Sequence, residues 1–209
     1  MNDNNLLAKR EQNSCVSDFI NDILPTHVMD SDLEAICDLI FEKACEVNEA
    51  CFYLAPSQME KNYQAIMAYE LSNAEIIYHS EVTIELLYKG FPLQDARADF
   101  VIHHGGPNNF EHDVIVEVKH SKQDKGNRDK ARLQLLGYLY NAPRHSAAML
   151  KPLEYGIVLH WPVQDEKKIW DEDPVSKAKL QSPVPRPRME LWHTTNASAT
   201  EFEILKTWL

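Results

Sequence analysis

The segment VIVEVK, residues 114–119, places two charged side chains in a run that is otherwise apolar enough for a buried strand. Because side chains alternate between the two faces of a strand, Glu117 and Lys119 share one face, roughly 6 to 7 Å apart. The preceding run RADFVIHH, residues 97–104, carries Asp99 in a similar setting. If the two strands pair, Asp99 approaches Glu117.

Two buried carboxylates at short range repel each other unless a cation neutralises them or one of them takes up a proton. Carboxylate oxygens are the ligands that Mg²⁺ prefers, and Mn²⁺ accepts them too. Lys119 beside such an ion would orient a water molecule or stabilise charge that develops on a phosphate. The alternative is a solvated strand face with an ion pair between Glu117 and Lys119, because so short a pattern arises often by chance.

Helical spacing of apolar residues predicts the elements before these strands. Residues 31–50 predict an amphipathic helix with Ser31 as its N-cap, and residues 57–76 predict a second helix that ends near Asn73. In the second helix Tyr63 belongs to the apolar stripe and is expected in the core. A third helix is predicted from about residue 129 to residue 140.

Period-two patterns predict the strands. Residues 76–88, 96–104 and 113–119 are expected to form a three-stranded antiparallel meander, with the turn KGF after the first strand. In the second strand Ala98, Phe100 and Ile102 should share the core face. A further strand is expected at residues 154–161, a proline-rich surface loop at 163–188, and a closing pair of strands within 189–209. The pattern indicates a mixed α/β fold.

Composition sets limits on the class of protein. A chain of 209 residues with 44% hydrophobic and 25% charged residues fits one domain, expected at 31–209 after a loose arm at 1–30. The net charge of -11 argues against nonspecific coating of nucleic acid by a basic surface but leaves room for a local basic groove. The cysteines lack metal-ligand spacing and are expected to be free thiols. With no apolar leader or membrane span, we expect a soluble intracellular protein of the cytoplasm or nucleus, without a membrane partner.

Five segments in a fixed order carry a family resemblance: SQMEKNY with AYEL, LLYKGF before RADF, then VIVEVK, LQLLGYL and YGIVLHW. Over residues 57–161 the chain resembles the PD-(D/E)XK nuclease superfamily and, within it, the GxxExxY proteins. The resemblance implies a restriction-endonuclease-like αβββαβ core, extended here by an N-terminal helix and C-terminal strands. It also implies a Mg²⁺- or Mn²⁺-dependent nuclease, in which the metal ligands are Glu60, Asp99 and Glu117 and the other catalytic residues are Lys119 and Gln134.

One position departs from the family pattern, because Ser57 stands where the GxxExxY motif has glycine. Ser57 and Glu60 then also fit a capping box, in which the two side chains satisfy backbone N–H groups at the start of a helix. A capping role for Glu60 is therefore as well supported by the sequence as a metal-binding role.

Six basic residues against three acidic ones lie between Glu117 and Arg132, which would suit phosphate contacts beside a metal. The residues expected to bind nucleic acid, with DNA placed before RNA, are Lys122, Lys125, Arg128 and Arg132. A charged loop before a helix explains this stretch nearly as well. Histidines near the turn, at 103, 104, 112 and 120, are expected to be solvated rather than ligands.

Two other functions and the assembly state stay open. A catalytically silent nuclease-fold protein could bind nucleic acid or a protein partner through the loop at 163–188, because a fold does not establish an activity. The segment PVPRPR could instead serve as a docking segment of an assembly protein. A homodimer is also left open.

Overall fold

The computed structural model describes residues 29–53, 59–89, 91–93, 95–144, 150, 153–164, 183–196 and 198–209. The predicted arm at 1–30 therefore lies outside the described residues except for its last two positions. Ser57 and most of the predicted loop at 163–188 lie outside them as well.

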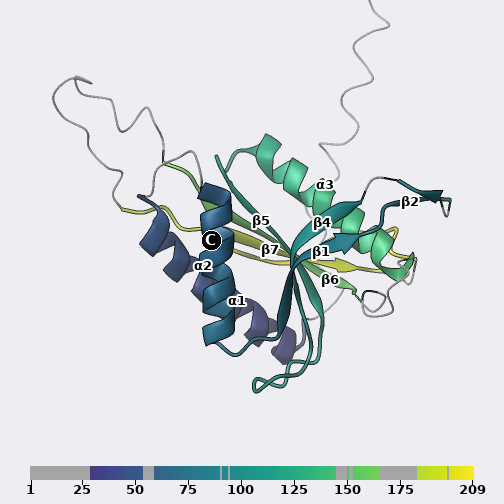
Figure 1. The fold of residues 1–209 in the computed structure, drawn as a ribbon, viewed down its shortest axis with the longest axis horizontal. Coiled ribbons are helices and arrows are strands. Elements are labelled where there is room, and N and C mark those ends of the chain that lie inside the picture. Colours follow the sequence, from purple (N-terminus) through teal and green to yellow (C-terminus); the bar gives the residue numbers. More distant parts are fainter. Residues whose placement is uncertain are drawn as a thin grey trace, which may run out of the picture.

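The described chain forms a mixed α/β fold around one large sheet (Figure 1). Its helices are α1 (Ser31–Cys51), α2 (Met59–Asn73), α3 (Lys125–Asn141) and a short 3-10 turn, η2 (Ala142–Arg144). Its strands are β1 (Tyr78–Ile84), β2 (Leu87–Tyr88), β3 (Phe91–Pro92), β4 (Ala96–Ile102), β5 (Val114–Ser121), β6 (Tyr155–Pro162), β7 (Arg188–Thr194) and β8 (Phe202–Trp208).

The six-stranded sheet has the order β1-β4-β5-β6-β7-β8. The strands β1, β4 and β5 form the predicted antiparallel meander, and β7 pairs with β8 in the predicted C-terminal hairpin. Only β5 and β6 run parallel, and α3 makes the crossover between them. This arrangement is the restriction-endonuclease-like α/β fold that the sequence predicted.

Helices cover both faces of the sheet (Figure 1). One apolar cluster joins α1 and α2 to side chains such as Phe100, Val116 and Leu159. A second cluster joins α3 to the opposite face, where Ile115 and Val158 are buried. The alternation predicted for β5 is therefore present, and Glu117 and Lys119 follow Ile115 on the face that α3 covers.

The helices begin at different residues from those predicted. Asp30, not Ser31, caps α1, because Oδ1 of Asp30 accepts a hydrogen bond of 2.7 Å from the backbone N–H of Leu33. Helix α3 begins at Lys125 instead of Asp129, because Asp124 caps it in the same way through the N–H of Asn127 at 2.9 Å. In each case a carboxylate is also favoured by the positive end of the helix dipole.

The connection from β1 to β4 is more elaborate than the single turn predicted at KGF. After β1 ends at Ile84, the short strands β2 and β3 pair as a separate two-stranded sheet. Lys89 between them has a φ of 51°, the left-handed conformation that tight turns use. The backbone N–H of Leu87 donates to Oδ1 of Asn141 at 3.0 Å and so ties this hairpin to the end of α3.

The face assigned to Ala98 was wrong. Phe100 and Ile102 pack on the α1 and α2 side as predicted, but Ala98 belongs to the cluster on the α3 side. The partner strand β1 has a left-handed residue, Glu81 with a φ of 57°, between the pairs Ser80–Phe100 and Val82–Ala98. The apolar side chains of β4 change sides at Asp99, next to this irregularity, while the register of the two strands stays the same.

Candidate active site

The candidate site lies where β4 and β5 stop pairing with each other. Their ladder includes only the pairs Phe100–Val116, Val101–Ile115 and Ile102–Val114. Asp99 and Glu117 are the next residues in that register, so they face each other at the mouth of the fork. Beyond this point β5 continues to Ser121 while pairing with β6 on its other edge.

Two carboxylates replace the missing strand partner of β5. Oδ2 of Asp99 accepts a hydrogen bond of 2.8 Å from the N–H of Val118, and Oε2 of Glu60 accepts one of 3.2 Å from the N–H of His120. Alternate N–H groups of a strand point toward the same edge, so both donors face the fork. The carboxylates at the fork therefore have a structural role even without an ion, because they accept hydrogen bonds from backbone N–H groups that lack a strand partner.

Glu117 lies deepest in this group. Its side chain is 1% exposed, and Nζ of Lys119 donates to its Oε1. The other oxygen, Oε2, is buried and has no hydrogen-bond partner among the described residues. A buried carboxylate oxygen without a donor is costly, and a cation is the natural partner for it.

The pKa values reflect this crowding. Burial raises the pKa of Glu117 to about 7, with a further rise from the charge of Asp99, although the Lys119 ammonium acts to lower it. Burial also raises the pKa of Asp99 to about 6, against the lowering effects of the Val118 N–H and Lys119. Burial and mutual repulsion therefore disfavour the ionised forms of both carboxyl groups, and a bound proton or cation would relieve that cost.

Glu60 and Lys119 are the other two charged residues at the fork. The carboxylate of Glu60 reaches β5, so its described hydrogen bond joins α2 to the sheet. The capping partner proposed for it, Ser57, lies outside the described residues. The pKa of Lys119 is raised, because the negative charges of Glu117, Glu60 and Asp99 outweigh the opposing effect of its burial.

Gln134 stands on α3 at the rim of the site. Its Nε2 donates at 2.6 Å to the hydroxyl of Tyr138, which in turn donates at 2.8 Å to the carbonyl of Arg97. The Tyr138 hydroxyl also acts on the pKa of Glu117. The Tyr138 hydroxyl thus donates its proton to Arg97, and no described hydrogen bond joins Gln134 to the carboxylates.

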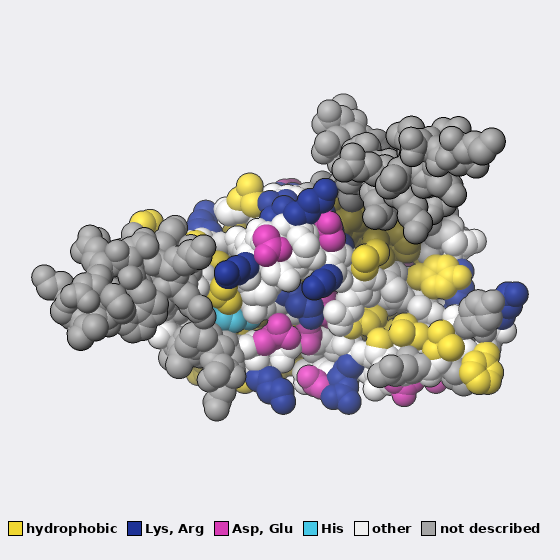
Figure 2. All heavy atoms as spheres, turned by 90° about the horizontal axis from the view of Figure 1, so that it is seen from above, with side chains coloured by type: hydrophobic (Ala, Val, Ile, Leu, Met, Phe, Trp, Pro, Cys, Tyr) yellow, Lys and Arg dark blue, Asp and Glu magenta, His cyan; other side chains and the backbone are white. Residues whose placement is uncertain are grey.

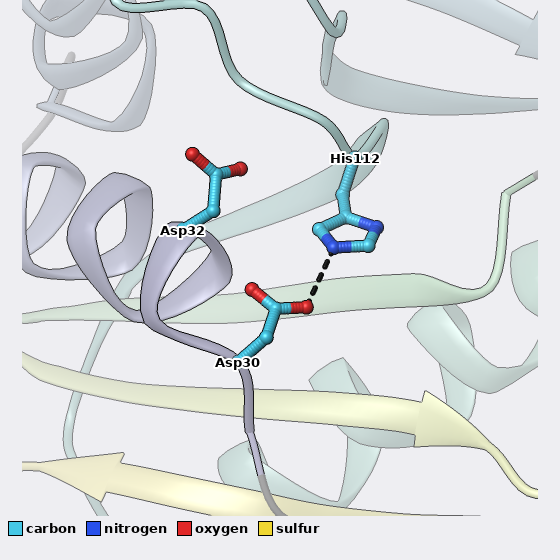
Figure 3. Close-up of side chains that lie close together, drawn as sticks. All are labelled: Asp30, Asp32 and His112. Atoms are coloured by element: carbon cyan, nitrogen blue, oxygen red, sulfur yellow. Dashed lines mark hydrogen bonds and ion pairs between the residues drawn. The ribbon is translucent and has the colours of Figure 1, made fainter.

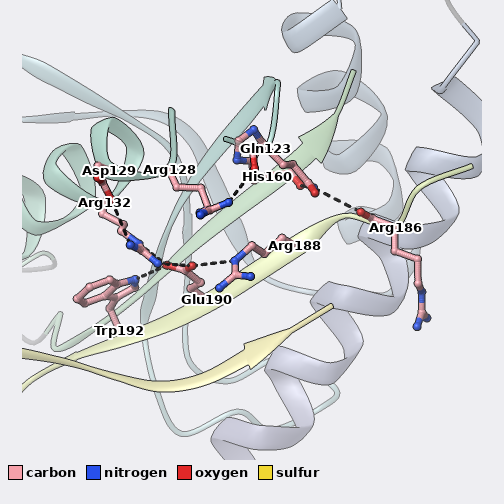
Figure 4. A network of polar contacts seen from close by, with 9 residues as sticks. All are labelled: Gln123, Arg128, Asp129, Arg132, His160, Arg186, Arg188, Glu190 and Trp192. Atoms are coloured by element: carbon pink, nitrogen blue, oxygen red, sulfur yellow. Dashed lines mark hydrogen bonds and ion pairs between the residues drawn. The ribbon is translucent and has the colours of Figure 1, made fainter. Parts of the chain in front are cut away.

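The residues predicted to contact nucleic acid differ in how available they are. Lys122 and Lys125 are exposed. Arg132, in contrast, makes hydrogen bonds of 2.8 and 2.7 Å to the carboxylate of Glu190, and its side chain is 14% exposed (Figure 4). Arg128 donates to the carbonyl of Gln123 at 2.7 Å. Seen from the α3 side, the surface mixes Lys and Arg with Asp and Glu in place of one continuous basic patch (Figure 2).

A second group of polar side chains lies at the other end of β5. Among the described residues, the one set of three His, Cys, Asp or Glu ligand atoms within 4.8 Å of one another belongs to Asp30, Asp32 and His112 (Figure 3). Ligand atoms of Glu60, Asp99 and Glu117 therefore do not all lie within 4.8 Å of one another. A hollow of about 250 Å³ beside His112 also lies at this end, about 20 Å from Lys119 by strand length.

The Asp30 cluster has a simpler structural explanation than metal binding. Asp30 caps α1 with one oxygen and contacts Nε2 of His112 at 2.7 Å with the other. Asp32 accepts the N–H of Glu111 at 2.8 Å. The positive end of the α1 dipole also disfavours a cation here. These contacts hold the segment before β5 against the start of α1.

Two residues of the site were not predicted. Gln64 donates from Nε2 to Oδ1 of Asp99 at 2.7 Å, and Tyr138 links Gln134 to the sheet. Each lies four residues after a predicted site residue, Glu60 or Gln134, on the same helix face. That spacing was the available signal. Tyr63 is in the core as predicted, with its ring stacked on His120 at 4.5 Å.

A family model described as the PD-(D/E)XK nuclease superfamily matches residues 34–151, which is more than half of the chain. The chain belongs to the PD-(D/E)XK nuclease superfamily. Searches of curated proteins and of solved structures found no match. No helix among the described residues is both long and apolar enough to cross a membrane.

Proposed function

We propose that the protein is a metal-dependent nuclease that hydrolyses phosphodiester bonds of nucleic acid, with DNA as the first substrate to test. The observation that carries the proposal is the pair of buried carboxylates at the fork, Asp99 and Glu117, with the Lys119 ammonium beside them. Membership of the nuclease superfamily supports the same chemistry. The narrower assignment to the GxxExxY group is part of this proposal.

The residues at the fork suit a hard divalent cation. The unpartnered Oε2 of Glu117 and the raised pKa values of both carboxyl groups are what a site built for positive charge would show without it. Asp99 and Glu117 would hold Mg²⁺ or Mn²⁺, with Glu60 as a third ligand. The ion would supply positive charge to a phosphoryl group and acidify water.

The protein groups have separate roles in this proposal. Lys119 holds Glu117 in place and presents its ammonium to an attacking water or to negative charge on the phosphate. Gln134 orients that water or a phosphate oxygen from the rim. Lys122 and Lys125 bind backbone phosphates, and Arg128 and Arg132 support that surface, Arg132 through its ion pair with Glu190.

A cleavage assay tests the proposal. Single-stranded DNA, duplex DNA and RNA are each incubated with the protein and Mg²⁺ or Mn²⁺, with EDTA as the control. We expect cleavage that depends on the metal and that Glu117→Ala and Lys119→Ala each abolish, while circular dichroism shows both variants folded. Activity that survives both substitutions would remove these residues from the mechanism.

One observation favours a second candidate, a nuclease-fold protein that binds without cleaving. The carboxylate of Glu117 is buried and already paired with Lys119, which could satisfy the fold without an ion. In that case calorimetry would detect binding of nucleic acid or a protein partner but no divalent cation at the fork.

A further inference from the structure

Two groups donate hydrogen bonds to the carboxylate of Asp99. One is a backbone N–H of the sheet, and the other is a side chain from a helix. The N–H of Val118 donates to Oδ2, and Nε2 of Gln64 donates to Oδ1 at 2.7 Å. The backbone donor comes from β5 itself. Gln64 reaches in from α2, where its side chain is half-buried four residues after Glu60.

Two donors on two different oxygens fix the rotation of a carboxylate. With Val118 alone, Asp99 could pivot about that single bond, and the negative charges of Glu117 and Glu60 would favour its moving away. With Gln64 added, each oxygen still keeps one lone pair for another partner, because a carboxylate has about four acceptor sites. The two hydrogen bonds thus orient the carboxylate and leave lone pairs on both oxygens available to a cation.

We propose that Gln64 is a positioning residue that holds Asp99 in the orientation in which it can share a divalent cation with Glu117. This inference rests on the proposed function. Outer-shell hydrogen bonds of this kind commonly set the affinity of a metal site, because they orient the ligand and remove its freedom to turn away.

The chemical type of residue 64 matters. An amide donates a hydrogen bond without carrying a charge, so it orients Asp99 while leaving the full negative charge for an ion. A lysine or arginine in its place would neutralise the carboxylate and compete with the cation. Lys119 already supplies the one ammonium that is described in contact with these carboxylates, and it pairs with Glu117.

The test measures Mn²⁺ binding by calorimetry, separately from cleavage. Gln64→Met keeps the length of the side chain and removes the amide. Gln64→Ala serves as a second variant in case methionine perturbs packing. Asn62→Ala is the matched control, because Asn62 is an exposed amide on the same helix. Circular dichroism and melting without metal establish that every protein is folded at the temperature of the titration.

We expect both Gln64 variants to bind Mn²⁺ roughly 10-fold to 100-fold more weakly than the wild type, and Asn62→Ala to bind like the wild type. In cleavage assays at fixed metal, kcat should fall while KM for nucleic acid stays nearly constant, which a general loss of folding would not produce. Folded Gln64 variants that bind Mn²⁺ as tightly as the wild type would overturn the positioning role. Failure of the wild type itself to bind Mn²⁺ would instead overturn the proposed function.

Discussion

Glu117 combines three features that are individually unfavourable for a side chain in a sheet. It is buried, it faces another carboxylate, and one of its oxygens has no described partner. Lys119 compensates for part of this cost through a charged hydrogen bond. An apolar residue in the same place would cost the fold less, which supports the proposed role of Glu117 in holding a cation.

A double-mutant cycle tests how strongly the two residues depend on each other. Lys119→Met removes the ammonium and leaves Glu117 buried without its partner, so the metal-free protein should lose roughly 1 to 3 kcal/mol in its free energy of unfolding. Adding Glu117→Gln should recover part of that loss, because the unpaired charge is gone. Urea denaturation in EDTA measures both. Glu117→Gln alone completes the cycle, and a double variant whose loss equals the sum of the two single losses would show that the pair is not coupled.

At the scale of elements, the sheet and its crossover helix are joined by one acid between two arginines. Glu190 on β7 accepts hydrogen bonds from Arg132 on α3 and from Arg188 on its own strand (Figure 4). Burial acts to raise the pKa of Glu190, but the hydrogen bonds and charges of the two arginines outweigh it and lower that pKa. The ionised carboxylate is therefore the form that holds α3 to β7.

This contact predicts a dependence of stability on pH. Because the folded pKa of Glu190 lies below its ordinary value of 4.5, the contribution is complete above that pH and is lost as the pH falls through the folded pKa. Glu190→Gln should cost about 1.5 to 3 kcal/mol at pH 7, and the difference from the wild type should shrink toward acid pH. Urea denaturation from pH 7 to pH 3 measures this. A difference that stays constant across the range would contradict the assignment.

The packing of α3 on β6 is close enough to test with two glycines. A methyl group added at Gly156 would lie 2.8 Å from Cδ1 of Leu135, which is itself fully buried, whereas one added at Gly137 would meet nothing within 4 Å. Gly156→Ala should therefore cost roughly 1 to 3 kcal/mol by overpacking. Gly137→Ala should raise the free energy of unfolding by about 0.5 to 1 kcal/mol, because alanine is the better helix former. Thermal unfolding of the pair measures both, and equal effects would mean that α3 sits farther from β6.

The sequence predicted the parts of the site that follow from alternation and helical spacing. Glu117 and Lys119 fall on one face because β5 keeps its period of two. Ala98 was misplaced because the left-handed backbone at Glu81 has no signature in residue type. Gln64 was missed because an amide on a helix is unremarkable until the fold brings Asp99 opposite to it. The sequence did not show that Arg132 is paired with a carboxylate and so less available to a phosphate, because its partner Glu190 is 58 positions away in the chain.

At the scale of the whole molecule, the acidic balance restricts how nucleic acid could approach. With a net charge of -11, long-range attraction of a polyanion is absent, so binding would depend on a short-range basic surface and would weaken with salt. The described α3 face offers basic groups interspersed with acidic ones (Figure 2). This mixture of charges argues against nonspecific coating of nucleic acid through a basic surface.

The molecule also has two acidic clusters at opposite ends of β5, and each is a candidate site for a divalent cation. Asp99 and Glu117 lie at the fork, whereas Asp30, Asp32 and His112 lie against the start of α1 (Figure 3). The hydrogen bonds of the second group are accounted for by capping and by contacts with the segment before β5. The proposed function therefore places divalent-cation binding at the fork and not at the Asp30 cluster.

Calorimetric titration of Mn²⁺ into the wild type, Glu117→Gln and His112→Ala tests that assignment most directly. The wild type and His112→Ala should bind the ion with the same affinity, and Glu117→Gln should show no binding, with all three proteins folded by circular dichroism. Binding that His112→Ala abolishes and Glu117→Gln leaves intact would contradict the account and move the metal to the other end of the strand.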